Sequence, residues 1–61
     1  MEDKLLRIPE VAAMTGFSIA TIRAWRQQGR GPKSGKLAGA VVYRESDVRS
    51  WIDEQLDAAT A

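Results

Sequence analysis

The apolar residues in the first half of the chain recur at helical spacing in two adjacent segments. Residues 8–16 have a proline in the first turn and a glycine at the end, which predicts a short helix. Ser18 is a suitable N-cap for a second helix over residues 19–28, and Gly29 closes it. Only a short turn separates the two, so the pattern predicts a helix-turn-helix. The predicted apolar anchors around the second helix are Phe17, Ile22 and Trp25.

Turn-forming residues and short apolar runs follow the second helix. Residues 30–36 are rich in glycine, proline, lysine and serine, which favours a loop that leads into a short edge strand. The segments 36–37 and 40–44 flank the dipeptide Ala38-Gly39 and predict a small two-stranded hairpin. The residues predicted to lie on its covered face are Leu37, Val41 and Tyr43.

The last part of the chain predicts a third helix. Ser46 is its expected N-cap, and residues 47–56 place apolar side chains on one face at positions i, i+3, i+4 and i+8. These side chains are Val48, Trp51, Ile52 and Leu56. We expect one domain over residues 1–61, with an ordered core of about 5–56 and a frayed end at 57–61. The predicted fold is mostly α-helical with a small two-stranded antiparallel wing, a winged helix-turn-helix.

Composition excludes several classes of function. The 61 residues include no cysteine and no histidine, so disulfides, the usual zinc sites and Ser-His-Asp or Cys-His catalysis are all excluded. We therefore expect no enzyme, no metal and no cofactor. No apolar run approaches the length of a membrane span, and we expect a cytoplasmic, DNA-associated protein. Trp25 and Trp51 lie at helical spacing and are predicted to pack in the core rather than to stack on single-stranded nucleic acid.

Charge is strongly segregated along the chain, although the formal net charge is only +1. The stretch from Val11 to Arg44 has six basic residues and no acidic one, whereas the rest has three basic and eight acidic residues. The middle of the chain should therefore attract a polyanion, and the phosphate backbone of nucleic acid is the one expected inside a cell. A plain solvated face is the alternative.

The second helix fits the requirements of a helix that reads the major groove. Such a helix hides one stripe in the core and presents small or polar side chains on the other, so that its backbone approaches the bases. Arg23 suits guanine O6 and N7, and Gln27 suits adenine N6 and N7. Ala20 or Ala24 suits a thymine methyl group.

A second set of residues is predicted to contact phosphates. Ser18 and Thr21 begin the second helix, and Ser18 is alternatively only a cap. Arg26 is expected to meet a phosphate or to pair with Glu10, and Arg30 to meet a phosphate or to cap carbonyls at the helix end. The cations expected beside the wing are Lys33, Lys36 and Arg44.

Several short motifs occur in a fixed order. They are Ser-x-x-Thr-Ile-Arg-x-Trp at 18–25, Gly-Arg-Gly-Pro at 29–32, and Tyr-Arg-x-Ser-Asp-Val-x-x-Trp-Ile at 43–52. Over roughly residues 5–56 the chain resembles the small winged-helix DNA-binding proteins of the excisionase and AlpA group, which are related to the DNA-binding domain of MerR regulators. The first motif is most similar to the recognition helix of phage excisionases. The resemblance implies that this helix reads the major groove and the wing reaches the adjacent minor groove.

The wing departs from the pattern of the group. Related wings often carry arginines at the tip, where this chain has Ala38, Gly39 and Ala40. Contact through those three residues is expected to involve backbone and shape only. Arg23 is therefore the main candidate for direct base readout.

The resemblance implies an excisionase, a directionality factor that bends attachment-site DNA so that a tyrosine integrase favours excision. A small transcriptional regulator of the AlpA type is the alternative, and an adaptor that has lost DNA binding is a third. No small-molecule effector and no membrane partner is expected. The third helix is acidic, so copies on adjacent DNA sites are expected to meet head to tail, acidic face to basic flank. Its acids are Asp47, Asp53, Glu54 and Asp57.

Overall fold

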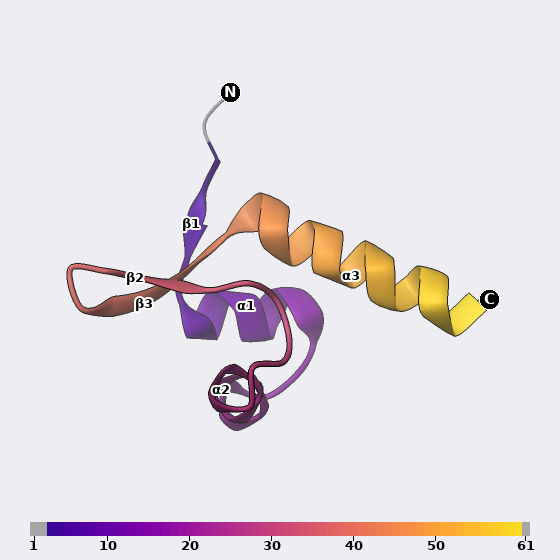
Figure 1. Ribbon diagram of the computed structural model, residues 1–61, viewed down its shortest axis with the longest axis horizontal. Coiled ribbons are helices and arrows are strands. Elements are labelled where there is room, and N and C mark those ends of the chain that lie inside the picture. The colour runs from indigo at the N-terminus through magenta and orange to yellow at the C-terminus, as the bar shows by residue number, and fades with distance from the viewer. Residues whose placement is uncertain (1–2, 61) are drawn as a thin grey trace.

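The computed structural model describes residues 3–60, which form three helices and three short strands (Figure 1). In chain order these are β1 (Leu5–Leu6), α1 (Ile8–Thr15), α2 (Ile19–Gln27), β2 (Gly35–Leu37), β3 (Ala40–Arg44) and α3 (Glu45–Thr60). The strands form one antiparallel sheet in the order β1-β3-β2, and the β2–β3 hairpin extends from it as the wing. The predicted winged helix-turn-helix is confirmed.

Local signals fix the helix-turn-helix. At the start of α1, a carboxylate oxygen of Glu10 accepts a 2.9 Å hydrogen bond from the backbone N–H of Arg7. Gly16 ends α1 in the left-handed conformation, with φ of 82°. The hydroxyl oxygen of Ser18 caps α2 by accepting a 3.1 Å hydrogen bond from the backbone N–H of Thr21. Both helices therefore begin where the sequence predicts.

The sheet has a third strand that the sequence analysis did not predict. Leu5 pairs with Arg44, and Leu6 pairs with Tyr43. A strand of two residues is too short to show an alternating pattern, so nothing in the sequence marked it. It matters for stability, because a two-stranded hairpin alone is marginal in water and β1 ties the base of the wing to the core.

The turn of the wing is strained at one position. Ala38 and Gly39 have φ of 51° and 84°, the sign pattern of a type I′ turn. The left-handed conformation costs alanine roughly 1 kcal/mol, whereas asparagine adopts it more readily. We therefore expect Ala38→Asn to raise the free energy of unfolding by about 0.5 to 1 kcal/mol, measured by urea denaturation. Ala38→Val is the control and should lower it, and equal stability of the two variants would contradict the strained turn.

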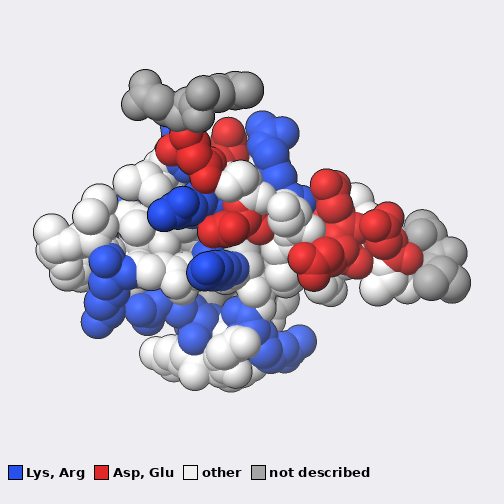
Figure 2. Space-filling view, turned by 45° about the horizontal axis from the view of Figure 1, so that its top comes forward, with Lys and Arg blue, Asp and Glu red and all other residues white. Residues whose placement is uncertain are grey.

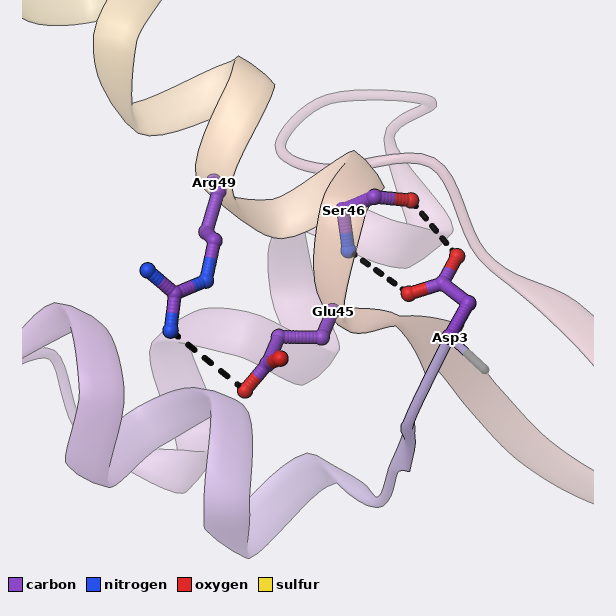
Figure 3. Close-up of polar contacts among 4 residues, drawn as sticks. All are labelled: Asp3, Glu45, Ser46 and Arg49. Carbon is purple, nitrogen blue, oxygen red and sulfur yellow. Dashed lines mark hydrogen bonds and ion pairs between the residues drawn. The ribbon is translucent and has the colours of Figure 1, made fainter. Parts of the chain in front are cut away.

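α3 begins at Glu45, directly after β3, and not at Asp47 as predicted. Ser46 is not the N-cap, because it lies inside the first turn (Figure 3). The cap is Asp3, whose carboxylate accepts hydrogen bonds from the Ser46 backbone N–H at 3.1 Å and from the Ser46 hydroxyl at 2.6 Å. The backbone N–H of Glu45 donates to the carbonyl of Lys4 at 2.8 Å. These hydrogen bonds form a clip between Asp3 and Lys4 of the N-terminal segment and the first turn of α3.

This clip is expected to make stability depend on pH. The hydroxyl and backbone hydrogen bonds from Ser46 hold the pKa of Asp3 below its ordinary value of 3.8. A carboxyl group whose pKa is lower when folded stabilises the fold above its unfolded pKa and loses that contribution as the pH falls through the folded value. Between about pH 5 and about pH 2, Asp3→Asn should therefore lose less thermal stability than the wild type, as measured by circular dichroism. Equal slopes in Asp3→Asn and the wild type would contradict the clip.

α3 also ends later than predicted. It continues to Thr60, past the predicted end near Leu56 and through most of the segment expected to fray. Residue 61 lies outside the described residues. Sixteen residues give a helix about 24 Å long, and its distal half projects beyond the rest of the molecule (Figure 1). Leu56 is accordingly 60% exposed.

The core is small and draws on all three helices and on β1 and β3. Its buried side chains are Leu6, Val11, Ala12, Ile22, Tyr43 and Val48. Trp25 and Trp51 are half-buried at its edge, with ring centroids 5.5 Å apart. Two predictions were wrong: Phe17 is 47% exposed and Leu37 is 56% exposed. The ring of Phe17 only meets the ring of Trp25 edge-on, at 4.8 Å between centroids.

Candidate nucleic-acid interface

The side of α2 that faces away from the core is open to solvent. Ile22 faces inward and is 1% exposed. The four residues predicted to contact bases are all exposed: Ala20, Arg23, Ala24 and Gln27. Their spacing places them on one stripe opposite Ile22, where the two alanines leave the helix backbone close to the surface. The geometry thus fits a helix that presents two long polar side chains on a shallow face, and base contact by these residues stays a prediction.

The predicted capping role of Ser18 is confirmed, and its hydroxyl makes a second contact. The hydroxyl oxygens of Ser18 and Thr21 lie 2.9 Å apart and share one hydrogen bond. That bond uses one of the two hydroxyl protons. The other proton remains to donate to an incoming acceptor, as contact with a phosphate would require. The phosphate role of these two residues stays a prediction.

Arg26 lies on the inner flank of α2, not on its outer stripe. It is half-buried, and its Nε finds no hydrogen-bond acceptor among the described residues. The alternative pairing with Glu10 does not form within that part of the chain; the Glu10 carboxylate caps α1 instead. Burial raises the pKa of Tyr43, while a hydrogen bond with Ser34 and the positive charge of Arg26 act in the opposite direction. Arg26 therefore lies close enough to Tyr43 of β3 to affect its pKa, and its contact with a phosphate stays a prediction.

The loop after α2 is held tightly against Trp25. The backbone N–H of Arg30 donates a 2.7 Å hydrogen bond to the Trp25 carbonyl. At Gly31, where φ is 78°, a Cβ would lie 3.2 Å from the Trp25 ring, so any other residue would be strained in its backbone and crowded against that ring. The Arg30 guanidinium makes a long contact of 3.5 Å with the Gln28 side chain, and the predicted capping of a carbonyl is made by the Arg30 backbone. The Arg30 side chain is exposed beside the end of α2.

The three cations predicted beside the wing come together around one hollow. Lys33, Lys36 and Arg44 line a depression of about 540 Å³ beside the hairpin. Gly35 and Asp47, the latter from the start of α3, also line it. The wing therefore carries its basic charge along its length rather than at its tip.

Charge is segregated in space as it is along the chain. In Figure 2 the projecting end of α3 shows acidic side chains, whereas basic side chains gather toward the wing end and the lower side of the molecule. The acids of the projecting end are Asp53, Glu54 and Asp57. Among residues 3–60, no group of three side chains is placed to bind a metal, and no helix in that range has the length and apolar character needed to cross a bilayer.

The apolar side chains left uncovered at the surface were not predicted from the sequence. Phe17, Trp25, Trp51 and Leu56 line a second hollow, of about 670 Å³, between the turn of the helix-turn-helix and α3. Leu37, near the tip of the wing, lines the first hollow instead. Their spacing correctly showed which residues share a face, but spacing does not show whether another element covers that face.

Comparison with known proteins agrees with this geometry. A family model described as a helix-turn-helix domain matches residues 5–56, which include α1, α2, the whole sheet and most of α3. No curated protein and no solved structure matches the chain.

Proposed function

Because the chain belongs to the helix-turn-helix domain family, it is a DNA-binding protein, and we propose that it binds a specific double-stranded sequence through α2 and the wing. The observation that carries this proposal is the exposed stripe of α2 formed by Ala20, Arg23, Ala24 and Gln27. That stripe lies within the stretch of the chain that has no acidic residue, and the basic hollow of the wing belongs to the same stretch. Attraction to phosphates would bring the duplex to this surface, and the stripe would select the sequence.

The proposed biological role is that of an excisionase, a non-enzymatic factor that bends attachment-site DNA for a tyrosine integrase. Support comes from the Ser-x-x-Thr-Ile-Arg-x-Trp motif, which starts at the N-cap and runs along α2 to Trp25. A single module of this size buries only about 600 to 1,000 Å² on DNA, so one copy alone would bind weakly. The proposal therefore includes cooperation between copies.

Self-association on DNA is proposed to join the acidic end of α3 to the basic wing of a neighbouring copy. The wing and the distal end of α3 point in opposite directions in Figure 1. The molecule is 39 Å long, comparable with one turn of B-DNA at about 34 Å, so copies bound one turn apart would meet. A contact between different surfaces repeats without closing, which suits a row of direct repeats.

Charge reversal tests this contact. We expect Asp53→Lys combined with Glu54→Lys to abolish cooperative filling of a DNA with two sites one turn apart, while leaving binding to a single site unchanged or tighter. A gel-shift titration of one-site and two-site duplexes measures both quantities. Arg49→Glu is the control on the same helix and should retain cooperativity. Undiminished cooperativity in the double variant would contradict the proposed contact.

A small transcriptional regulator of the AlpA type is the second candidate, since the same surface would serve at a promoter. The first experiment is a gel-shift selection from a library of short duplexes at two salt concentrations, followed by sequencing of the bound DNA. Evenly spaced direct repeats beside an integrase attachment site support the excisionase, whereas a site that overlaps a promoter supports the regulator. The absence of any shift at low salt would contradict DNA binding and favour an adaptor.

A further inference from the structure

Leu37 is exposed at a place where a large apolar side chain contributes little to the fold. It is the last residue of β2, adjoins the turn at Ala38-Gly39 and is 56% exposed. Its cross-strand partner is Ala40, and Gly35, two residues before it on the same face of the strand, has no side chain. Leu37 therefore stands above small neighbours, on the part of the wing that reaches farthest from the core (Figure 1).

The surroundings of Leu37 are cationic. Lys33, Lys36 and Arg44 line the same hollow as Leu37. Among the described residues that line it, Asp47 is the one acidic residue and Leu5 is another apolar one. The tip beyond Leu37 carries no charge. Cations placed in this way would hold phosphates on either side of the wing while the uncharged tip faces the groove between them. This arrangement fits a duplex better than an apolar protein partner, because three cations against one carboxylate leave the hollow with a net positive charge, which favours a polyanion.

The tip is also slim. Ala38, Gly39 and Ala40 follow Leu37, and none has a side chain longer than a methyl group. The minor groove of B-DNA is about 6 Å wide and admits little bulk. Proteins that bend DNA from the minor groove insert apolar side chains, including leucine, between base steps and kink the duplex toward the major groove.

We propose that Leu37 is an apolar wedge that enters the minor groove beside the site read by α2 and partly unstacks one base step. This inference rests on the proposed DNA binding and adds the source of the bend. The kink bends the duplex toward the adjacent major groove, where α2 lies, so that the DNA wraps more of the protein surface. The step chosen is one that unstacks easily, such as TA or CA/TG, so Leu37 adds sequence preference without a hydrogen bond to a base.

Two measurements on the selected duplex test the wedge. The first places 2-aminopurine, an adenine analogue whose fluorescence rises when it unstacks, at successive positions along the site. The second measures the bend by circular-permutation gel shift. The wild type is expected to raise the fluorescence several-fold at one step near the wing and to bend the duplex by roughly 20° to 90°.

Leu37→Ala is expected to abolish the fluorescence rise and most of the bend, with the salt dependence of binding unchanged. Leu37→Phe should restore both signals, because it keeps an apolar side chain large enough to unstack a step. Leu56→Ala is the matched control: it also truncates an exposed leucine, 60% exposed on α3, and should behave as the wild type. Circular dichroism confirms that each variant is folded before it is tested.

The outcomes separate the wedge from the proposed function. If Leu37→Ala binds, bends and unstacks the duplex as the wild type does, the wedge is wrong and DNA binding stands. If the wild type binds without any bend or fluorescence rise, the wedge is again wrong. If the wild type shifts no duplex at low salt, the proposed function fails and the wedge fails with it.

Discussion

Ile22→Ala is expected to leave much of the protein unfolded at room temperature. Ile22 is 1% exposed and joins α2 to the core. Truncating a buried isoleucine to alanine costs about 2 to 5 kcal/mol, because the apolar contacts are lost and the cavity is only partly refilled. A chain of 61 residues has only about 3 to 5 kcal/mol of stability available. Urea denaturation followed by far-ultraviolet circular dichroism measures the loss.

Ile19→Ala is the matched control for this prediction. It makes the same chemical change in the same helix, but Ile19 is 41% exposed. Exposed positions without special contacts change stability by about 0.5 kcal/mol, and alanine has the higher helix propensity. A similar loss of stability in both variants would mean that the α2 side of the core is not packed as the structure shows.

The helices were predictable from sequence because their ends are determined by neighbouring residues. Gly16 ends α1 and Ser18 starts α2, and both act within four residues of themselves. The outer stripe of α2 was predictable for the same reason, since Ile22 fixes which side of the helix is buried and the rest follows from helical geometry. Local chemistry thus determined the part of the protein that carries the proposed site.

Features that depend on distant residues were not predictable from the sequence alone. The cap of α3 comes from Asp3, which is 43 residues from Ser46. The pairing of β1 with β3 likewise joins residues far apart in the chain, such as Leu5 and Arg44. Neither contact produces a periodic pattern of apolar residues in the sequence. A side-chain cap involves a single residue, and a strand of two residues is too short to show alternation between apolar and polar positions.

The exposure of two apolar residues, Leu37 and Phe17, was also not predicted from the sequence. The apolar pattern predicted that Leu37 lies on a covered face of the hairpin. In the structure Leu37 ends the short strand β2 and is exposed, because the core covers one face of the sheet and Leu37 lies outside the covered area. Phe17 was predicted as an anchor, yet it only meets the edge of Trp25 at the surface. A pattern of apolar residues states which positions share a face, whereas their burial depends on which elements are present to cover them.

Arg23→Ala is expected to weaken binding to the selected duplex by about 1 to 3 kcal/mol and to relax the sequence preference at one base pair. The reason is that a bidentate contact to guanine is lost only on the correct sequence, while random DNA offers no such contact. Lys36→Ala should instead weaken binding to all sequences alike and lower the salt slope by about one unit, because it removes one phosphate contact. Gel-shift titrations on selected and random duplexes at several salt concentrations measure both effects.

Arg49→Ala is the control that separates the loss of a contact with DNA from the loss of one positive charge. It also replaces an exposed arginine by alanine, but Arg49 lies on α3 and pairs with Glu45 at 3.6 Å, away from the stripe of α2. It should therefore leave affinity and sequence preference close to those of the wild type, since an exposed pair of this kind contributes little. Equal losses on selected and random DNA for Arg23→Ala would show that Arg23 contacts a phosphate, and base readout would then fall to Gln27.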